Sequence, residues 1–401
     1  GARRTQVSAR NSLQWLLVGA QVALSVTLLT TAGLLGRSLH ALSRIDPGFE
    51  TRRVLTFRMS GSWGETSDFA RVVERIDTAI AALEALPGVE SAATIGWSLP
   101  GVPTQFETTF ELAEASSAAG PPLVAEGRAV SPEYFATMRI PIVAGELCRR
   151  RAAVAGAEAM VNRAFVTRYV ADRPSAVGLH LRDTGNPSPA PVRIVGVVGD
   201  ARERGIASQA SPAVYWCASA PNPMPYFLVR TDGDPLALAR DVRLKMKELE
   251  PLRSIYDIAP LEQRIGDAFA ENRLRAALVA LFAAAALSLS AVGLYGTLSY
   301  AVSLRRREVG LRLALGATRR RILSGFMAHA LRVVGVACVV GVALALASTR
   351  LIAGMLFGVS PSDPLTLGGV IVVVIAVAAL SVLVPSTRAA LLEPMQVLRE
   401  Q

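Results

Sequence analysis

Histidine and nucleotide-binding motifs are scarce or missing in this sequence of 401 residues. Of its three histidines, only His40 and His180 lie in the polar region between residues 37 and 273, too few and too far apart to indicate a zinc site. Neither the H-E-x-x-H zinc motif nor a G-x-x-x-x-G-K-[ST] phosphate-binding loop occurs. We therefore predict no metal site and no cofactor. If the protein uses ATP, another chain hydrolyses it.

Cysteine is equally scarce, and three cysteines do not make a disulfide framework. Cys338 lies within an apolar run, whereas Cys148 and Cys217 share the polar region. An oxidising compartment would allow these two to pair. Their spacing leaves pairing open, and we expect two separate thiols.

Catalytic motifs are also missing from the polar region. The stretch "GWSLPG" at residues 96–101 departs from the G-x-S-x-G nucleophile motif, because Pro100 stands where the second glycine is needed. The glycine-rich "GVVGDARERG" at residues 196–205 lacks the G-x-G-x-x-G spacing. We interpret Asp200 and Glu203 as turn and surface residues rather than as an acid/base pair. We predict no catalytic residue, and therefore that the chain is not an enzyme.

Charged residues are missing from four long segments of a chain that is 51% hydrophobic, with a mean hydropathy of +0.39. A helix that spans a bilayer needs roughly 20 apolar residues. Three uncharged runs meet this requirement, at residues 11–36, 276–304 and 365–384. The fourth, residues 333–349, is shorter, but Arg332 and Arg350 flank it and can extend to the membrane interfaces. We predict transmembrane helices at residues 11–36, 274–304, 327–357 and 365–386.

The composition of these spans limits what they can do. No acidic residue lies within any of them, so a proton or sodium relay through carboxylates is unsupported. They are rich in Gly, Ala and Ser, which allow helices to approach closely in lipid. Gly293 with Gly296, and Gly335 with Gly341, are candidate packing faces.

The basic excess is confined to the segments beside the spans. The formal net charge is +10, yet residues 37–273 carry 27 Lys and Arg against 28 Asp and Glu. The remainder of the chain carries 15 Lys and Arg against 4 Asp and Glu. A nucleic-acid-binding protein would carry the excess on a folded domain, so we predict a lipid bilayer as partner and no nucleic acid.

The positions of the arginines predict the topology, because cytoplasmic loops of membrane proteins are basic. The topogenic arginines that we single out between the second and third spans are Arg305, Arg306, Arg307, Arg319, Arg320 and Arg321. Both termini (residues 1–10 and 387–401) and the loop 305–326 are therefore expected in the cytoplasm. Residues 37–273 and the short loop 358–364 are expected outside. We expect the first span to be an uncleaved anchor, since its apolar run exceeds that of a signal peptide.

The polar region has a mixed α/β pattern. Residues 53–60 read as a strand, followed by an amphipathic helix that Ser67 or Asp68 can cap, and by a second strand from residue 89. A strand at residues 226–231, a helix and a strand repeat this order near the far end. The two β-α-β units predict one subdomain built from both ends of the region. Residues 100–225 would be inserted into it as a second, β-rich subdomain.

In the order of its segments, the chain resembles the FtsX-like/MacB-type ABC permeases. The words "AVGLYGTLSYAVSLRRREVGLRLALGATRRRIL", "LFGVSPSDPLTL" and "VPSTRAALLEPMQVLREQ" resemble the membrane part of that family, and "VSPEYFATMRIP" and "IVGVVGDARERG" its outer domain. The greatest resemblance is to the duplicated, acidobacterial-type permease subgroup, with this chain as the second half. Because the chain begins with glycine, we expect it to be a piece of a longer polypeptide. The expected fold is an α-helical membrane protein with four transmembrane helices, one before and three after an α+β extracytoplasmic domain of two subdomains, like the MacB periplasmic core.

The resemblance implies a cellular location and partners. The expected location is the bacterial inner membrane. The partners are an ABC ATPase subunit on the cytoplasmic side, a second permease half or copy, and periplasmic or outer-membrane components. The expected function is to couple ATP hydrolysis by that subunit to movements of the periplasmic domain, for export or extraction of hydrophobic, lipid-linked or peptide cargo. Two alternatives remain: a non-transporting regulator of an extracytoplasmic enzyme, and, with less support, a membrane-anchored enzyme.

The resemblance also implies that the cytoplasmic loop docks on the ATPase. Glu308 and Arg312 are spaced i,i+4, which suits one turn of helix, and Gly316 can end it. The predicted coupling residues are Glu308, Val309, Gly310, Leu311, Arg312, Leu313, Leu315, Gly316 and Ala317. The alternation of apolar residues at 309–315 also fits a strand. A further alternative is a plain loop of topogenic arginines whose leucines rest in the membrane interface.

Overall fold

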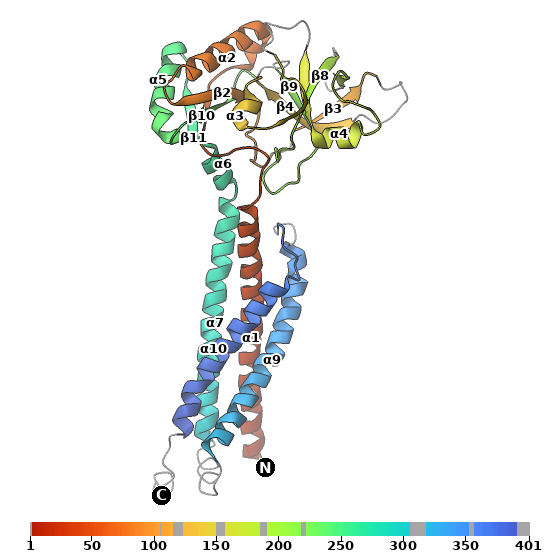
Figure 1. Ribbon diagram of the computed structural model, residues 1–401. Helices are drawn as coiled ribbons and strands as arrows, with labels where there is room; N and C mark the ends of the chain where they lie inside the picture. Colours follow the sequence, from red (N-terminus) through yellow and green to blue (C-terminus); the bar gives the residue numbers. More distant parts are fainter. Residues whose placement is uncertain are drawn as a thin grey trace. The chain divides into compact units, whose positions relative to one another are not determined.

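The computed structural model describes residues 2–104, 106–114, 123–149, 157–184, 191–217, 222–304, 318–352 and 357–390. The chain divides into two compact units. The helical unit consists of Gly1–Arg44 and Glu271–Gln401, and the α/β domain of Ile45–Ala270. Figure 1 shows the long helices of the helical unit and the helices and strands of the α/β domain.

The helical unit contains four long helices: α1 (Ala2–Leu42), α7 (Ala270–Leu304), α9 (Arg319–Ile352) and α10 (Pro364–Ala390). Each holds a stretch that is long and apolar enough to cross a membrane: Leu13–Leu42, Ala270–Ala301, Ala330–Ser348 and Pro364–Leu383. One such helix precedes the α/β domain in the chain and three follow it. The predicted fold class is therefore confirmed.

Small residues bring α9 and α7 into close contact with α1. A Cβ added at Gly341 in α9 would lie 2.7 Å from the carbonyl oxygen of Ala23 in α1. A Cβ at Gly293 in α7 would lie 2.8 Å from Oε1 of Gln21. By contrast, a Cβ at Gly296 or Gly335 would meet nothing within 4 Å. Only one member of each predicted glycine pair therefore lies at a helix contact.

Polar side chains supplement this packing at two levels of α1. In its middle, the hydroxyls of Ser25 and Ser290 are 2.9 Å apart and buried. Near its C-terminal end, Arg37 pairs with Asp363, whose Oδ2 accepts a 2.8 Å hydrogen bond from the backbone N–H of Thr366 in the first turn of α10. Hydrogen bonds between helices help to fix their register in lipid, where van der Waals packing is the other attraction between them.

The first lobe of the α/β domain is a four-stranded antiparallel sheet. Its strands are, in spatial order, β11 (Ile255–Pro260), β1 (Val54–Met59), β10 (Tyr226–Thr231) and β2 (Val89–Ile95). Helices α2 (Phe69–Glu84) and α5 (Ala239–Leu249) cover one face of it (Figure 1). The strands and helices predicted at both ends of the region are confirmed, including Asp68 as the N-cap of α2.

The periodicity of the sequence explains the core of this lobe. Leu55, Phe57 and Met59 alternate along β1 and all point into one hydrophobic cluster. Val72, Ile76, Ile80 and Leu83 recur at helical spacing along α2 and enter the same cluster. Strand and helix periods thus converge on one buried layer.

The second lobe is a ring of six strands. Their order is β4 (Leu123–Val130), β3 (Glu107–Leu112), β7 (His180–Asp183), β8 (Val192–Val198), β6 (Glu158–Asn162) and β9 (Ala213–Cys217). A parallel pairing of β4 with β9 closes the ring, and β5 (Ile142–Gly145) adds to β8. Phe110, Val161 and Val214 fill its core, together with Phe165 from α4 (Arg163–Tyr169). The predicted β-rich insert therefore has a hydrophobic core of its own.

A disulfide joins Cys148 to Cys217 in this lobe, across a Cα–Cα distance of 6.3 Å. The prediction of two separate thiols is wrong. Cys217 ends β9 opposite Glu158 of β6, and the carboxylate of Glu158 accepts a 2.9 Å hydrogen bond from the backbone N–H of Arg149, next to Cys148, so the two cysteines lie together although 69 positions separate them. Spacing in the sequence carries no trace of that proximity.

The two lobes share one continuous sheet, but the junction is narrow. Ile95 of β2 and Val130 of β4 are the residue pair in register there. The backbone N–H of Gly96 donates to the carbonyl of Ala129 at 2.7 Å, and that of Ser131 to the carbonyl of Thr94 at 3.0 Å. Helix α3 (Tyr134–Met138) follows β4 directly and packs against β2 and β10.

Candidate functional site

The predicted coupling residues 308–317 and the arginines 305–307 lie outside the described residues. Arg319, Arg320 and Arg321 form the first turn of α9, and their side chains are not described. Along the chain, these residues follow the end of α7 and precede the start of α9. The predictions for these residues stay predictions.

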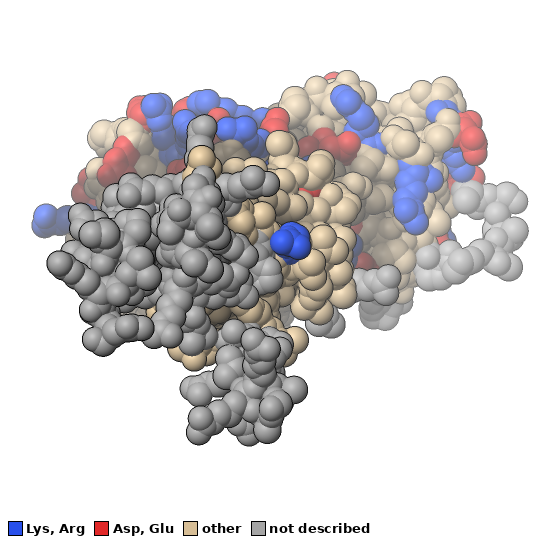
Figure 2. Space-filling view, turned by 90° about the horizontal axis from the view of Figure 1, so that it is seen from below, with Lys and Arg blue, Asp and Glu red and all other residues tan. Residues whose placement is uncertain are grey.

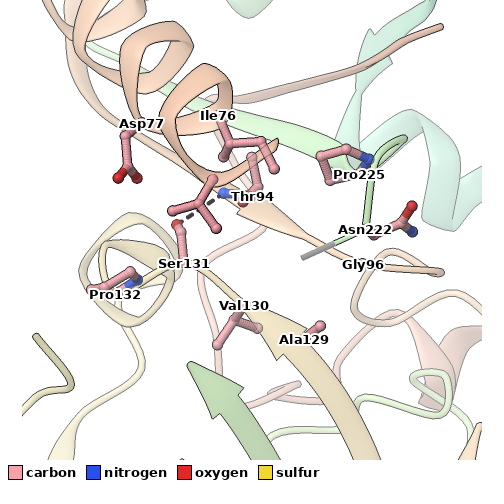
Figure 3. Close-up of a pocket in the computed structure, with 11 residues that line it drawn as sticks. Ile76, Asp77, Thr94, Gly96, Ala129, Val130, Ser131, Pro132, Asn222 and Pro225 are labelled. Atoms are coloured by element: carbon pink, nitrogen blue, oxygen red, sulfur yellow. Dashed lines mark hydrogen bonds between the residues drawn. The ribbon is translucent and has the colours of Figure 1, made fainter. Parts of the chain in front are cut away.

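Within the α/β domain, a small pocket of about 40 Å³ lies at the junction of the two lobes. We call it the junction pocket (Figure 3). Helix α2 contributes Ile76 and Asp77, strand β2 contributes Thr94 and Gly96, and β4 with its following turn contributes Ala129, Val130, Ser131 and Pro132. Clefts between lobes are frequent ligand sites, because both walls can move to fit a ligand.

The junction pocket is mainly apolar with a few polar groups. Its polar side chains include Asn222, Ser131 and Asp77, and Asp77 supplies the carboxylate (Figure 3). The hydroxyl of Ser131 already accepts a 3.1 Å hydrogen bond from the backbone N–H of Thr94. This arrangement suits a small apolar group that carries a hydrogen-bond donor, and it lacks the paired nucleophile and base that covalent catalysis requires.

A buried cluster of charges lies at the same junction; we call it the ion cluster, and it consists of Glu126, Arg128, Glu203 and Arg204. Nη2 of Arg128 donates to the carbonyl oxygen of Glu203 at 2.9 Å, and Nη1 donates to the hydroxyl of Ser98. Arg204 Nε lies 2.6 Å from Oε1 of Glu126. Arg128, Glu126 and Glu203 are each at most 3% exposed. Our interpretation of Glu203 as a surface residue is therefore wrong.

Two tyrosines complete the surroundings of Glu203. The hydroxyls of Tyr134 and Tyr215 both donate to Oε1 of Glu203, at 3.0 and 3.1 Å. Burial, reinforced by the negative charge of Glu203, raises the pKa of both tyrosines well above the usual range. Burial also raises the pKa of Glu126, although Arg128 and Arg204 oppose this shift. The tyrosines therefore remain hydrogen-bond donors and do not act as bases.

The ion cluster is too enclosed to reach a substrate, so its role is to hold the lobes together. Its sequence signal was present but ambiguous: a glutamate and an arginine stand inside the apolar strand "LVAEGRAVS", and a charged loop follows "IVGVVGD". Only the tertiary structure shows that the charges of this strand contact those of the loop. In the part of the chain that the structure describes, no group of three His, Cys, Asp or Glu side chains is placed to hold a metal ion.

Three exposed aromatic rings form a stack at one end of the first lobe. Trp63 begins the 3-10 helix η1 (Trp63–Asp68) and stacks on Trp97 at a ring separation of 5.2 Å, and Trp97 stacks on Phe106 at 5.6 Å. Each ring is 41–49% exposed. Trp97 also has a φ of +65°, which disfavours side chains with a Cβ. An exposed aromatic surface held in a strained backbone is typical of an interaction site.

Comparison with known proteins finds a family similarity in the helical unit. Residues 280–394 match the family described as FtsX-like permease C-terminal. The matched region begins within α7 and continues through α9 and α10. The chain thus combines an FtsX-like permease region with helices that can cross a membrane and with an α/β domain.

One curated protein is similar over part of the chain. The macrolide export ATP-binding/permease protein MacB of Nitrobacter winogradskyi is 30% identical over 145 residues, which is 36% of this chain and 22% of the relative. The chain therefore corresponds to about a fifth of the length of that protein.

Solved structures of low similarity include two extracytoplasmic domains. The periplasmic region of MacB from Actinobacillus actinomycetemcomitans is 11% identical with a TM-score of 0.37, over 56% of this chain and 95% of that one. The extracellular domain of the noncanonic ABC-type transporter YknZ from Gram-positive bacteria is 10% identical with a TM-score of 0.32, over 50% of this chain and 100% of that one.

Proposed function

We propose that the chain is a permease subunit, or half of one, in an ABC transporter system. The observation that carries this proposal is the FtsX-like permease match over residues 280–394, in a chain whose four long apolar helices flank an α/β domain. The duplicated subgroup and the place of this chain as a second half are part of the proposal, as is a second permease copy or half as partner.

The energy source is a separate ATPase subunit. The MacB relative is named for an ATP-binding and a permease part in one protein. This chain has no phosphate-binding loop, so ATP hydrolysis must take place elsewhere. The contact is the segment between α7 and α9, where residues 308–317 combine apolar side chains with arginines that make good interface contacts.

The disulfide supports the orientation. Disulfides persist in oxidising compartments, so Cys148–Cys217 favours an extracytoplasmic α/β domain. The arginines near the N-terminus and between α7 and α9 favour a cytoplasmic location for the opposite ends of the helices. Both arguments give the same topology, with the termini in the cytoplasm of a bacterial cell and the helices in its inner membrane.

The mechanism is transmission of movement. Closure of the partner ATPases shifts the segment between α7 and α9, the helices carry the shift, and the α/β domain responds on the outer side. Among the described residues of these stretches, the acidic side chain is Glu271 in the first turn of α7, where it pairs with Arg275, and none lies in the middle of a span to serve an ion relay. The movement then exports or extracts hydrophobic, lipid-linked or peptide cargo.

A second candidate function is regulation of an extracytoplasmic enzyme without transport. The exposed stack of Trp63, Trp97 and Phe106 favours it, because aromatic side chains are enriched where proteins dock on one another. Export of cargo by the purified system in vesicles would separate the two functions, since a regulator alone would move none.

The test of the proposal is a crosslink in living cells. A photoreactive residue would replace Leu311, and mass spectrometry would identify the captured protein. A matched control replaces Leu252, which is fully exposed on the α/β domain. We expect an ABC ATPase at position 311 and none at position 252. Capture of lipid alone at position 311, at good yield, would refute the coupling role and leave the arginines as topology signals. A Glu308→Lys or Leu311→Asp variant should insert normally but lose the ATP dependence of its activity.

A further inference from the structure

The segment that follows α1, residues 45–53, is held by a buried arginine of the first lobe. We call it the linking segment. Arg230 of β10 is 1% exposed. Its guanidinium donates to the carbonyls of Glu50 and Arg52, both at 3.1 Å, and to the carbonyl of Thr137 in α3 at 2.5 Å. These three carbonyls compensate a buried charge that no carboxylate contacts among the described residues.

A loop of the second lobe holds the same segment from the other side. This loop, residues 199–208, contains most of the glycine-rich stretch that has no catalytic role. The backbone N–H of Arg202 donates to the carbonyl of Pro47 at 2.8 Å. Gly48 has a φ of +80°, and a Cβ there would lie 2.0 Å from the carbonyl oxygen of Asp200. The linking segment and the loop are therefore in direct contact, with no space for a Cβ at Gly48.

Hydrogen bonds tie the loop to itself and to the second lobe. Oδ1 of Asp200 accepts a 2.7 Å hydrogen bond from the backbone N–H of Ala164 in α4. Nη1 of Arg202 donates to the carbonyls of Ile206 and Ser208, at 3.2 and 2.7 Å, and so fastens the loop onto itself. These hydrogen bonds link the part of the loop that contacts residues 45–53 to the residues that follow it.

The middle of the loop contributes Glu203 and Arg204 to the ion cluster at the lobe junction. Glu203 lies three residues beyond Asp200 and accepts hydrogen bonds from Tyr134 and Tyr215, while its carbonyl accepts one from Arg128. Arg128 in turn reaches Ser98, which follows β2 of the first lobe. One short loop thus contacts the linking segment and both sides of the junction.

We propose that loop 199–208 is a mechanical relay that couples the position of the linking segment to the geometry of the lobe junction and of the junction pocket. The proposal rests on the proposed function, which supplies the force on residues 45–53 through α1. Few backbone hydrogen bonds cross the junction, so a shift of Glu203 alters the angle between the lobes more readily than it alters either core. Pocket occupancy and the position of the linking segment are then reciprocally linked.

The test is hydrogen exchange measured by mass spectrometry on the full chain in lipid nanodiscs, without ATPase or nucleotide. Gly48→Ala disturbs the contact with Asp200. Gly178→Ala is the matched control, because Gly178 also has a positive φ, +95°, but a Cβ there meets nothing within 4 Å. In Gly48→Ala we expect exchange to rise about 5- to 100-fold in peptides from loop 199–208 and around Tyr134 and Tyr215, the range of typical couplings. Gly178→Ala should leave these peptides unchanged.

A variant in the ion cluster, read out at the linking segment, tests the relay independently. Glu203→Gln keeps the shape of the side chain but weakens the ion cluster, so exchange should rise in peptides of the linking segment. This variant decides the matter if Gly48→Ala does not fold. Exchange changes confined to residues 45–53 in Gly48→Ala, or an unchanged linking segment in Glu203→Gln, would overturn the relay. Because no ATPase takes part, the relay can fail while the crosslink at position 311 succeeds, and the reverse.

Discussion

Arg128 and Glu203 are joined by a 2.9 Å hydrogen bond from the guanidinium of the first to the carbonyl oxygen of the second, although 75 positions separate them. The side chain of Arg128 also lies 3.6 Å from Oε2 of Glu126 on its own strand. All three side chains are almost completely buried. Charges in such surroundings depend on their partners, since no water replaces a partner that is lost.

Loss of Arg128 should therefore destabilise the α/β domain strongly. Arg128→Met leaves Glu203 buried without its cation and Glu126 with Arg204 alone, and we expect a loss of about 3–5 kcal/mol in the free energy of unfolding. The measurement is urea unfolding of the full chain in nanodiscs, followed by tryptophan fluorescence. Arg139→Met is the control, because Arg139 and Glu90 form an exposed pair and its loss should cost at most about 1 kcal/mol. Equal losses in the two variants would contradict a structural role for the ion cluster.

Glu65 should make the stability of the first lobe depend on acid pH. Hydrogen bonds from Arg253 and Arg75 lower its pKa from 4.5 to about 2. A lowered pKa in the folded state adds stability above pH 4.5, and that stability is lost as the pH falls from about 4.5 to about 2. Glu65→Gln should lose about 2–3 kcal/mol at pH 7 and approach the unmodified protein near pH 2.

The measurement is urea unfolding at a series of pH values between 7 and 2. Glu248→Gln serves as the control, since Glu248 pairs with Lys245 across an exposed helix surface. It should change stability by no more than about 0.5 kcal/mol at any pH. A difference between Glu65→Gln and the unmodified chain that stays constant down to pH 2 would rule out the ionic origin.

The disulfide should be present in protein isolated from cells without reductant. Thiol labelling of the denatured chain should then modify Cys338 alone, and labelling after reduction should modify all three cysteines. Replacement of Cys148 and Cys217 by serine should cost ~4 kcal/mol, because the bond closes a loop across 69 positions. Three labelled thiols in unreduced protein would count against both the bond and the extracytoplasmic location of the domain.

Gly341 should tolerate no larger residue. Gly341→Leu places a side chain where the backbone of Ala23 and the side chain of Val26 already lie, and must separate α1 from α9. Gly335→Leu in the same helix faces open space and should be harmless. The measurement is the temperature at which the detergent-solubilised chain loses its monodisperse elution profile. The contact is refuted if both variants behave alike.

The local elements could be predicted from the sequence because their signals are local. Strand β1 and helix α2 each show their own period of apolar residues, and Asp68 caps the helix that it precedes. The repeated strand–helix–strand order also predicted one subdomain built from both ends of the region, and β1, β2, β10 and β11 of that subdomain lie in one sheet. The closed ring of the second lobe could not be predicted, because the pairing of β4 with β9 brings together strands that lie far apart in the chain.

The candidate site likewise has some features that the sequence shows and others that only the tertiary structure shows. The absence of a phosphate-binding loop and the arginines between α7 and α9 are properties of the sequence, whereas the partner ATPase was implied by the family resemblance and stays a prediction. In the sequence, Trp97 stands out only as part of "GWSLPG", the stretch that departs from the nucleophile motif. Its stacking on Trp63 and Phe106 depends on three separate segments that meet at the end of a sheet.

By itself, the sequence determined the four apolar helices, their place around the α/β domain and the elements of the first lobe, since hydrophobic runs and periods act through neighbouring residues. The tertiary structure alone decided that Cys148 meets Cys217, that Glu203 is buried, and that Gly341 rather than Gly335 touches α1. Each of these depends on which distant backbone lies within a few ångströms of the residue. Proximity of that kind is set by packing of the whole unit and leaves no pattern along the chain.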